Sequence, residues 1–224
     1  MRVWVLLTAD HDLYFFKEGY LRTSSSEFEI DLENVDDVFV HLTNNAVQKN
    51  ASNYGQFEDG NQLSFKRFQE YIDEFYPDSG VDVYKHLVPQ MIEIIVKTCT
   101  AVRKTIDPGR RKNCFELFGY DFILDEDFNS WLIEVNTNPC LEESSNLLKM
   151  LLPRMIEDML KLTVDVSFPK SGLRKRKEGK KTFRTPTKPQ PTLPSGLSNS
   201  AVVPASGSKA QDYPNMFDKR RQTN

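Results

Sequence analysis

The chain has 224 residues, of which 39% are hydrophobic and 11% aromatic, as in an ordinary globular domain rather than a disordered or membrane protein. No apolar run reaches the roughly 18 residues that a membrane-spanning helix needs, so no membrane segment is expected. The net charge of −3 is unevenly divided. Residues 163–224 hold 13 Lys and Arg against 4 Asp and Glu, whereas residues 1–162 hold 16 basic and 28 acidic residues. We therefore expect an acidic folded body followed by a basic tail.

The start of the chain predicts short strands. Residues 3–7 form an apolar strand, and residues 13–16 are its expected hairpin partner across a turn at 9–12. A polar connection follows, and then a further short strand at 38–42. Because the first strand is too apolar to stand at an edge without partners, we expect the chain to begin inside a domain.

Two amphipathic helices are expected next. The apolar residues of 64–75 recur at spacings of three and four, and Ser64 is suited to cap the start of that helix. A second helix is expected over 83–106, with Pro89 in its first turns, where proline is tolerated. The apolar faces of both helices are expected to pack in the core.

The second half of the chain predicts a hairpin, a helix and a tail. Residues 114–124 are apolar on nearly both faces, which favours a central strand, and residues 131–136 form the next one. A helix begins at Ser144 or Ser145 and is expected to kink or restart at Pro153. After Asp165 the basic, Pro- and Ser-rich sequence cannot bury enough apolar surface to offset its ordering entropy.

The fold class expected from these elements is α+β, a mostly antiparallel sheet with flanking helices. We assign residues 1–163 to this domain and residues 164–224 to a disordered tail. The basic cluster in the tail is open to three interpretations: a solvated linker, a nuclear localisation signal, or a surface that meets an acidic partner. The cysteines Cys99, Cys114 and Cys140 lack the paired spacing of a metal site and are expected to be free thiols in a reducing cytosol.

The strand in "WLIEVNTNPCLE" carries two polar side chains, Glu134 and Asn136. Side chains alternate along a strand, so both should share a face with Leu132. An unpaired buried carboxylate is costly, which indicates that another group neutralises Glu134. The opposite face is expected to carry the apolar side chains Trp131, Ile133 and Val135.

The preceding strand offers the acid Asp121. With a hairpin loop at 126–129, Asp121 lies directly opposite Glu134, and Gly119 lies opposite Asn136. Opposed residues have Cβ atoms about 4.5–5.5 Å apart, so the two carboxylates repel unless a proton or a cation lies between them. A register shifted by one residue would separate the two acids onto different faces.

Two carboxylates and an amide, without His or Cys, suit a hard cation. Mg²⁺ is usually bound by one or two carboxylates together with substrate phosphates. Gly119 opposite Asn136 is expected to leave space for a ligand or for waters. The alternative is that Asp121 and Glu134 pair with separate basic residues or share a proton.

Two arginines and one polar motif are further candidates. Arg2 and Arg22 lie among strand or turn residues, and a guanidinium binds phosphate and carboxylate bidentately, although for each arginine taken alone a surface salt bridge is the simpler expectation. "HLTNNAVQK", with His41, Thr43 and Asn44, ends a predicted strand in hydrogen-bonding side chains; by chemistry alone it could be a turn with a helix cap. No P-loop, Gly-rich fingerprint or Gly-x-Ser-x-Gly elbow is present.

In combination these motifs resemble the tubulin–tyrosine ligase and tubulin–tyrosine-ligase-like family. "RVWVLLT", "GYLRTSS", "VHLTNNAVQK", "NYGQFEDGN", "FELFGYDFILDED" and "WLIEVNTNP" occur in the family's order, over about residues 2–162. The resemblance implies an ATP-grasp fold, of which this chain would be the C-terminal portion, and an ATP-dependent ligation of an amino acid to tubulin. ATP phosphorylates a carboxylate, and the incoming amine then displaces the phosphate.

The resemblance also implies roles for single residues. Asp121, Glu134 and Asn136 would hold Mg²⁺ against the ATP phosphates, while Arg2 and Arg22 would act as catalytic contacts to phosphate and to the reacting carboxylate. The cofactor-binding motif His-Leu-Thr-Asn corresponds to His41, Thr43 and Asn44. The implied partners are the acidic C-terminal tail of tubulin and a free amino acid, with no nucleic acid and no membrane. The expected location is cytoplasmic, on microtubules, with a cilium or flagellum as a specialised case.

The resemblance leaves the transferred amino acid open among tyrosine, glutamate and glycine. "VQKNASNYGQFEDGN" looks like the tyrosine ligase, whereas "EVNTNPCLE" looks like the chain-elongating members. The family also has a nucleotide-clasping segment before the strand that begins here, so we expect the chain to be a fragment, a partial gene model or a non-catalytic relative. The rival to the ligase is therefore a catalytically inactive module that binds tubulin or microtubules. A small-molecule ATP-grasp ligase is the weaker third interpretation.

Overall fold

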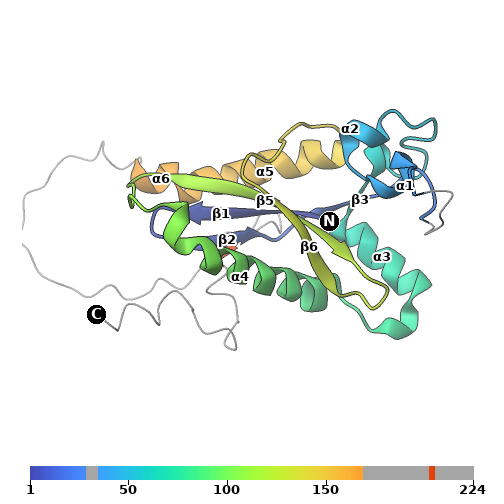
Figure 1. The fold of residues 1–224 in the computed structure, drawn as a ribbon, viewed down its shortest axis with the longest axis horizontal. Helices are drawn as coiled ribbons and strands as arrows, with labels where there is room; N and C mark the ends of the chain where they lie inside the picture. Colours follow the sequence, from blue (N-terminus) through green and yellow to red (C-terminus); the bar gives the residue numbers. More distant parts are fainter. Residues whose placement is uncertain (29–34, 169–201, 205–224) are drawn as a thin grey trace, which may run out of the picture.

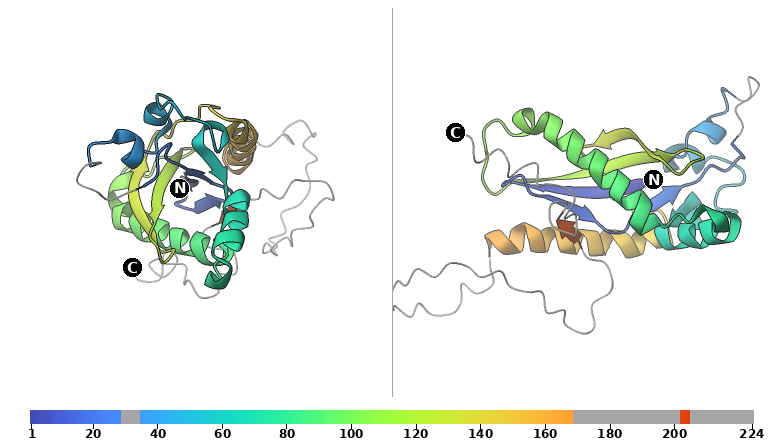
Figure 2. Two further views of the ribbon diagram at one scale, coloured as in Figure 1. Left: turned by 90° about the vertical axis from the view of Figure 1, so that its right-hand side faces the viewer. Right: turned by 90° about the horizontal axis from the view of Figure 1, so that it is seen from below.

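The computed structural model describes residues 1–28, 35–168 and 202–204 (Figure 1). They form one sheet in which every described strand pair is antiparallel, with helices on both faces (Figure 2). The predicted α+β class, a mostly antiparallel sheet with flanking helices, is confirmed for these residues. No helix among them combines the length and the hydropathy needed to cross a membrane.

Strand β1 (Arg2–Thr8) forms the centre of the sheet, and all but the last of its residues are buried. It pairs along its whole length with β5 (Phe115–Leu124). On its other side the end of β1 pairs with β2 (Leu13–Phe16), and its start pairs with β3 (Tyr20–Arg22). The outer strands are β6 (Ser130–Asn136) beyond β5, β4 (Gln62–Ser64) beyond β3 and β7 (Val202–Pro204) beyond β2.

One face of the sheet packs against three helical segments. Alternate residues of β1 and β5, such as Val5 and Tyr120, point to this side and are fully or almost fully buried. The covering segments are α3 (Phe65–Phe75), a single π-helical turn η3 (Val83–Leu87) and α4 (Val88–Ile106). Ser64 caps α3, as predicted: its hydroxyl accepts a hydrogen bond from the Arg67 backbone N–H.

The opposite face packs against a single long helix, α5 (Asn146–Leu162). Trp4, Phe16 and Tyr20 from the sheet meet the buried apolar side chains of this helix. Ser145 caps its start, which confirms one of the two predicted positions. α5 continues through Pro153 as one helix, so the predicted restart there is wrong.

The connections contain short helical turns. The strand predicted at 38–42 is wrong, because α1 (Val38–His41) forms there with the Asp37 side chain accepting from the Phe39 backbone N–H at 2.8 Å. Local capping outweighs the alternating apolar pattern of this segment. The other short helices are α2 (Asn45–Gln48), η1 (Asp59–Asn61), η2 (Pro77–Ser79) and α6 (Val164–Ser167). The expected disorder at 169–201 and 205–224 concerns residues that lie outside the described ranges.

The β5–β6 hairpin contains an irregularity that the sequence did not predict. Leu124 pairs with Ser130, so the loop is one residue longer than expected. A bulge at Ile133 then restores the predicted register, with Asp121 opposite Glu134 and Gly119 opposite Asn136.

Because of the same bulge, the first side chains of β6 point to the opposite faces of the sheet from those predicted. Leu132 pairs with Phe122 and packs against the core beneath α4, so its predicted position on the face of Glu134 is wrong. Trp131, which pairs with Ile123, lies on the face of Asp121 instead. Both side chains are largely exposed, Trp131 at 60% and Ile123 at 56%.

Candidate functional site

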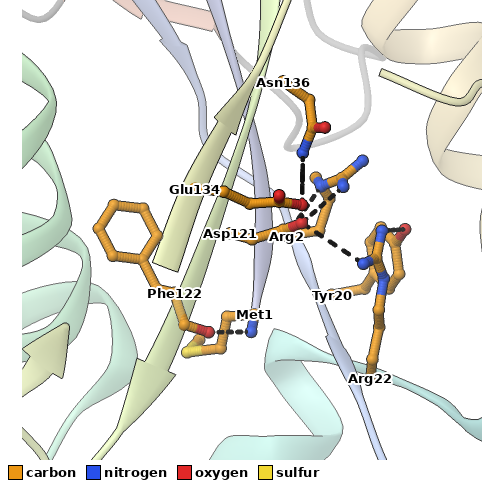
Figure 3. Close-up of polar contacts among 8 residues, drawn as sticks. All are labelled: Met1, Arg2, Tyr20, Arg22, Asp121, Phe122, Glu134 and Asn136. Carbon is orange, nitrogen blue, oxygen red and sulfur yellow. Dashed lines mark hydrogen bonds and ion pairs between the residues drawn. The ribbon is translucent and has the colours of Figure 1, made fainter. Parts of the chain in front are cut away.

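A buried ion pair joins Arg2 and Asp121 at the place where β1 meets β5 (Figure 3). The two residues are direct cross-strand partners. Arg2 Nε donates to Asp121 Oδ1 at 2.6 Å and Nη2 donates to Oδ2 at 2.7 Å, which makes the pair bidentate. The side chains are only 5% and 10% exposed.

Arg22 reaches the same carboxylate from the neighbouring strand β3. Its Nη1 lies 3.5 Å from Asp121 Oδ2, and its Nη2 donates to the Tyr20 hydroxyl at 3.2 Å. Tyr20 is itself the cross-strand partner of Arg2, so β3 is held in register beside the ion pair. Three strands thus bring two guanidinium groups to one carboxylate.

The charges of this cluster stabilise one another. Burial on its own would raise the pKa of Asp121, but the hydrogen bonds from Arg2 and the positive charges of Arg22 and Arg2 outweigh it, so the pKa is lowered. Burial would likewise lower the pKa of Arg2, yet its hydrogen bonds and charge interaction with Asp121 raise it. Both groups are therefore charged at neutral pH.

Strand β6 adds Glu134 and Asn136 to the cluster, as the predicted register requires. Asn136 Nδ2 lies 3.0 Å from Glu134 Oε1 and 3.4 Å from Asp121 Oδ2, so the amide bridges the two carboxylates (Figure 3). Glu134 is exposed and Asp121 is buried. Glu134 is therefore the carboxylate of the cluster that faces solvent, whereas Asp121 and Arg2 form its buried ion pair.

The expectation of open space beside Gly119 is wrong. A Cβ atom at this position would lie 2.8 Å from Pro139 Cβ and 3.2 Å from Arg2 Nη1. Glycine is needed because Pro139, from the segment after β6, folds back over the strand next to the Arg2 guanidinium. The space is filled by protein atoms that hold the arginine in place.

The donor set fits a hard cation through oxygen atoms. Among the described residues no group of three or more His, Cys, Asp and Glu side chains could hold a metal, so a site here depends on two carboxylates and one amide. A carboxylate offers about four lone-pair directions. Arg2 takes one on each Asp121 oxygen, and Arg22 and Asn136 also approach Oδ2, so Oδ1 is the oxygen with fewer donors and the better placed to meet a cation. The Asn136 amide, rotated by half a turn, presents its oxygen to the same point.

The predicted nucleotide motif lies on the α1–α2 segment. Asn44 caps α2, its side-chain oxygen accepting from the Val47 backbone N–H at 3.0 Å, as the helix-cap alternative expected. The His41 ring packs edge-on against Phe28 at 5.9 Å between ring centroids, and Thr43 is half-buried. Hydrogen bonds of two intermediate side chains connect this motif to β3.

Those intermediates, Gln48 and Asn61, were missed by the sequence analysis. The fully buried Gln48 donates through Nε2 to the carbonyls of Phe39 and Leu42 at 3.0 and 2.7 Å, and its Oε1 accepts from the Ser25 backbone N–H at 2.8 Å. The sequence does show a glutamine at position 48 within the polar motif "HLTNNAVQK". A glutamine there is simply expected to be exposed, so nothing in the sequence marked it as buried.

Asn61 completes the link with a left-handed backbone, at φ 51°. Its Nδ2 donates to the Ser25 hydroxyl at 2.8 Å and to the Thr23 carbonyl at 3.3 Å. Thr23 directly follows Arg22, so the network connects the α1–α2 segment to the strand that carries the second arginine. The positions of these side chains depend on long-range packing that sequence spacing does not reveal.

A sequence model of the tubulin-tyrosine ligase family matches residues 1–172. This match covers most of the chain, and the chain belongs to that family. The resemblance stated from its motifs is thereby confirmed.

Of three relatives, two are named for modifying tubulin, and the third is named a protein monoglycylase. The chain is 38% identical over 183 residues to tubulin glycylase 3D of Tetrahymena thermophila, covering 78% of this chain and 17% of the relative. It is 35% identical to the probable tubulin polyglutamylase TTLL9 of Mus musculus, with 80% and 37% covered. It is 36% identical to the protein monoglycylase TTLL8 of Homo sapiens, with 75% and 20% covered. The chain thus spans between about a sixth and somewhat more than a third of the length of these relatives.

Proposed function

We propose that this chain forms the C-terminal portion of an ATP-grasp fold and contributes to an ATP- and Mg²⁺-dependent ligase that attaches an amino acid to tubulin. The observation that supports this most directly is the convergence of Arg2, Arg22, Asp121, Glu134 and Asn136 from four strands onto one point. Membership of the tubulin-tyrosine ligase family supplies the chemical class.

In this proposal Asp121, Glu134 and Asn136 hold the cation. Mg²⁺, when bound, would neutralise the phosphate oxygens of ATP and favour phosphoryl transfer. Asp121 is prepared for this role because its lowered pKa keeps it ionised. Glu134, being exposed, provides the carboxylate that meets the ion from solvent.

The two arginines have different proposed roles. Arg2 commits Nε and Nη2 to Asp121 and is buried, so it positions the carboxylate and contributes fixed positive charge. Arg22 is less committed, at 3.5 Å from Asp121, and is the better placed to contact phosphate or the reacting carboxylate. His41, Thr43 and Asn44 would approach the nucleotide from the α1–α2 segment.

The reaction needs no nucleophilic side chain. The γ-phosphoryl group of ATP passes to a carboxylate oxygen, which gives an acylphosphate and ADP. The amine of the incoming group attacks the acyl carbon, phosphate leaves, and the amine loses a proton as the amide bond forms. Positive charge from the arginines stabilises both the transferred phosphoryl group and the tetrahedral intermediate.

The names of the relatives favour glycine or glutamate over tyrosine as the transferred amino acid. The acidic C-terminal tail of tubulin is the proposed acceptor, which would place the protein on the microtubule cytoskeleton. Residues 163–224, with their excess of Lys and Arg, would strengthen that encounter electrostatically.

The test is incorporation of radiolabelled glycine, glutamate or tyrosine into tubulin with ATP and Mg²⁺. In the complete protein we expect one label to be incorporated, and Glu134→Gln to abolish incorporation while leaving microtubule co-sedimentation nearly intact. Glu116→Gln, which removes an exposed acid at the far end of β5, is the matched control and should remain active. If the same amount of protein co-sediments with microtubules with and without ATP, and no label is incorporated, the result would instead favour a binding module without ligase activity.

A further inference from the structure

A cavity lies at the opposite end of the sheet from the Asp121 cluster. It has a volume of about 1440 Å³ and is lined by the turn after β1, the end of α4, the loop before β5, and α6. Strand β1 begins at Arg2, in the Asp121 cluster, and ends at Thr8, which lines the cavity. At about 3.3 Å per residue, the length of this strand places the two sites roughly 20 Å apart. The end of α4, the start of β5 and α6 lie together in Figure 1, away from the start of β1.

The charge of the lining is strongly positive for a body that is acidic overall. Five Lys and Arg side chains and only two carboxylates, Asp10 and Asp107, line the cavity. Asp107 is already paired, since its Oδ1 accepts from Arg111 Nε at 3.0 Å and its Oδ2 accepts from the Arg111 backbone N–H at 2.8 Å. The other basic lining residues are Arg103, Lys104, Arg110 and Lys112.

The loop that carries these charges has a defined shape. Arg110 and Asn113 both adopt left-handed backbone conformations, with φ of 46° and 56°. Asp107 binds the backbone of the loop through Arg111, so the loop folds back toward the end of α4. Lys104, Arg110 and Lys112 are exposed, and no described ion pair involves them.

The rest of the lining is mixed, with polar side chains such as Thr100 and Asn113 beside apolar ones. Val166 and Phe168 are 70% and 74% exposed, and Phe115 and Leu162 add to the same surface. A small anion would need only the charges, and small-molecule pockets are usually about 300–1,000 Å³. A cavity larger than this, with both basic and apolar side chains, suits a segment of polypeptide.

We propose that this cavity is a second binding site, for an acidic polypeptide segment. Its carboxylates would meet Lys104, Arg110 and Lys112, and its aliphatic or aromatic side chains would contact α6 and Phe115. Charge complementarity argues against the chain's own residues 169–224 as the occupant, because that segment carries an excess of Lys and Arg. The inference does not depend on the proposed ligase activity.

The first test is fluorescence anisotropy with a labelled oligoglutamate peptide and the complete 224-residue chain. Lys104→Gln/Arg110→Gln/Lys112→Gln should weaken binding by on the order of tenfold, because three exposed charge contacts are lost. The matched control Lys66→Gln/Arg67→Gln/Lys85→Gln removes the same charge from α3 and η3 and should bind like wild type. Circular dichroism melting verifies that both variants are folded. Equal loss in the two triple variants, or none in either, would assign the binding to the basic tail and overturn the proposal.

A second readout locates the peptide. Cys114 lines the cavity, whereas Cys140 lies next to Pro139 at the Asp121 cluster. The rate at which maleimide modifies each cysteine is monitored by mass spectrometry. We expect oligoglutamate to slow the modification of Cys114 and to leave the modification rate of Cys140 unchanged. Protection of Cys140 alone would place the peptide at the Asp121 cluster and contradict a second site. Displacement of the peptide by an equal concentration of inorganic phosphate or ATP would show a small-anion site instead.

Discussion

Among single residues, the buried Arg2 is the one around which the Asp121 cluster is organised. Arg2 is a cross-strand partner of Asp121, donates twice to its carboxylate, and lies against Gly119 and Pro139. A buried pair of this kind contributes little net stability, but removing one partner leaves an uncompensated charge. The residues around it are therefore expected to be sensitive to small changes.

Gly119→Ala tests the packing around Arg2. The new methyl group would lie 2.8 Å from Pro139 Cβ, so we expect a loss of about 1–3 kcal/mol in unfolding free energy, as for other overpacked sites. Urea denaturation measures this. Gly109→Ala is the control, because a Cβ at Gly109 meets nothing within 4 Å. Equal stability of the two variants would show that the close approach is not real.

Asp121→Asn tests the charge of the buried pair. It leaves Arg2 without a counter-charge, and at pH 7 we expect a loss of about 3–5 kcal/mol. The pKa of Asp121 is lowered in the folded state, so the ionised carboxylate stabilises the fold above its unfolded value near 3.8. That contribution is lost as the pH falls through the folded-state pKa.

The difference between wild type and Asp121→Asn should therefore shrink as urea denaturation is repeated below pH 3.8. Asp36→Asn, at an exposed position, should differ little from wild type at any pH. A difference for Asp121→Asn that stays constant down to the lowest pH would exclude a dominant ionic contribution.

At the scale of elements, the β5–β6 hairpin illustrates what sequence reasoning achieves. The prediction of Asp121 opposite Glu134 used alternation together with an assumed loop at 126–129, and the pairing itself is confirmed. The same reasoning was insufficient for Trp131 and Leu132, because a bulge adds one residue without a recognisable composition. A longer loop and the bulge at Ile133 offset each other, so the register at the cluster was right although the predicted loop was not.

The α1–α2 segment shows the opposite case. Its alternating apolar residues predicted a strand, but the helix cap at Asp37 stabilises a helical turn there instead. Its attachment to β3 rests on Gln48 and Asn61, whose partners are distant in sequence. Short strands such as β3 and β4, with three residues each, carry too little pattern to be predicted.

Gln48→Ala tests that attachment. The substitution removes the buried hydrogen bonds that Gln48 makes to two backbone carbonyls and one backbone N–H. Because these backbone groups lose their partners, we expect the free energy of unfolding to fall by about 2–4 kcal/mol. Hydrogen exchange should accelerate in residues 37–48 and remain slow in β1 and β5. The exposed Gln56→Ala is the control. Uniform acceleration over the whole sheet would mean that Gln48 supports the global fold rather than this segment.

At the scale of the whole molecule, charge and shape divide the described residues into two ends. The Asp121 cluster is at one end of β1 and the basic cavity at the other. Composition predicted an acidic body, yet it could not predict that Lys104, Arg110 and Lys112 gather at one place within it. That gathering requires the end of α4 and the loop before β5 to be brought beside α6 by the sheet.

Asp121, Glu134 and Asn136 are proposed to hold a divalent cation together with ATP. The most direct measurement is Mn²⁺ binding to the complete chain in the presence of ATP, followed by electron paramagnetic resonance, with Glu116→Gln as the matched control. We predict that Glu134→Gln weakens Mn²⁺ binding by on the order of tenfold or more, as removal of a carboxylate ligand should. Identical Mn²⁺ affinities for wild type, Glu134→Gln and Glu116→Gln would show that Glu134 does not bind the cation.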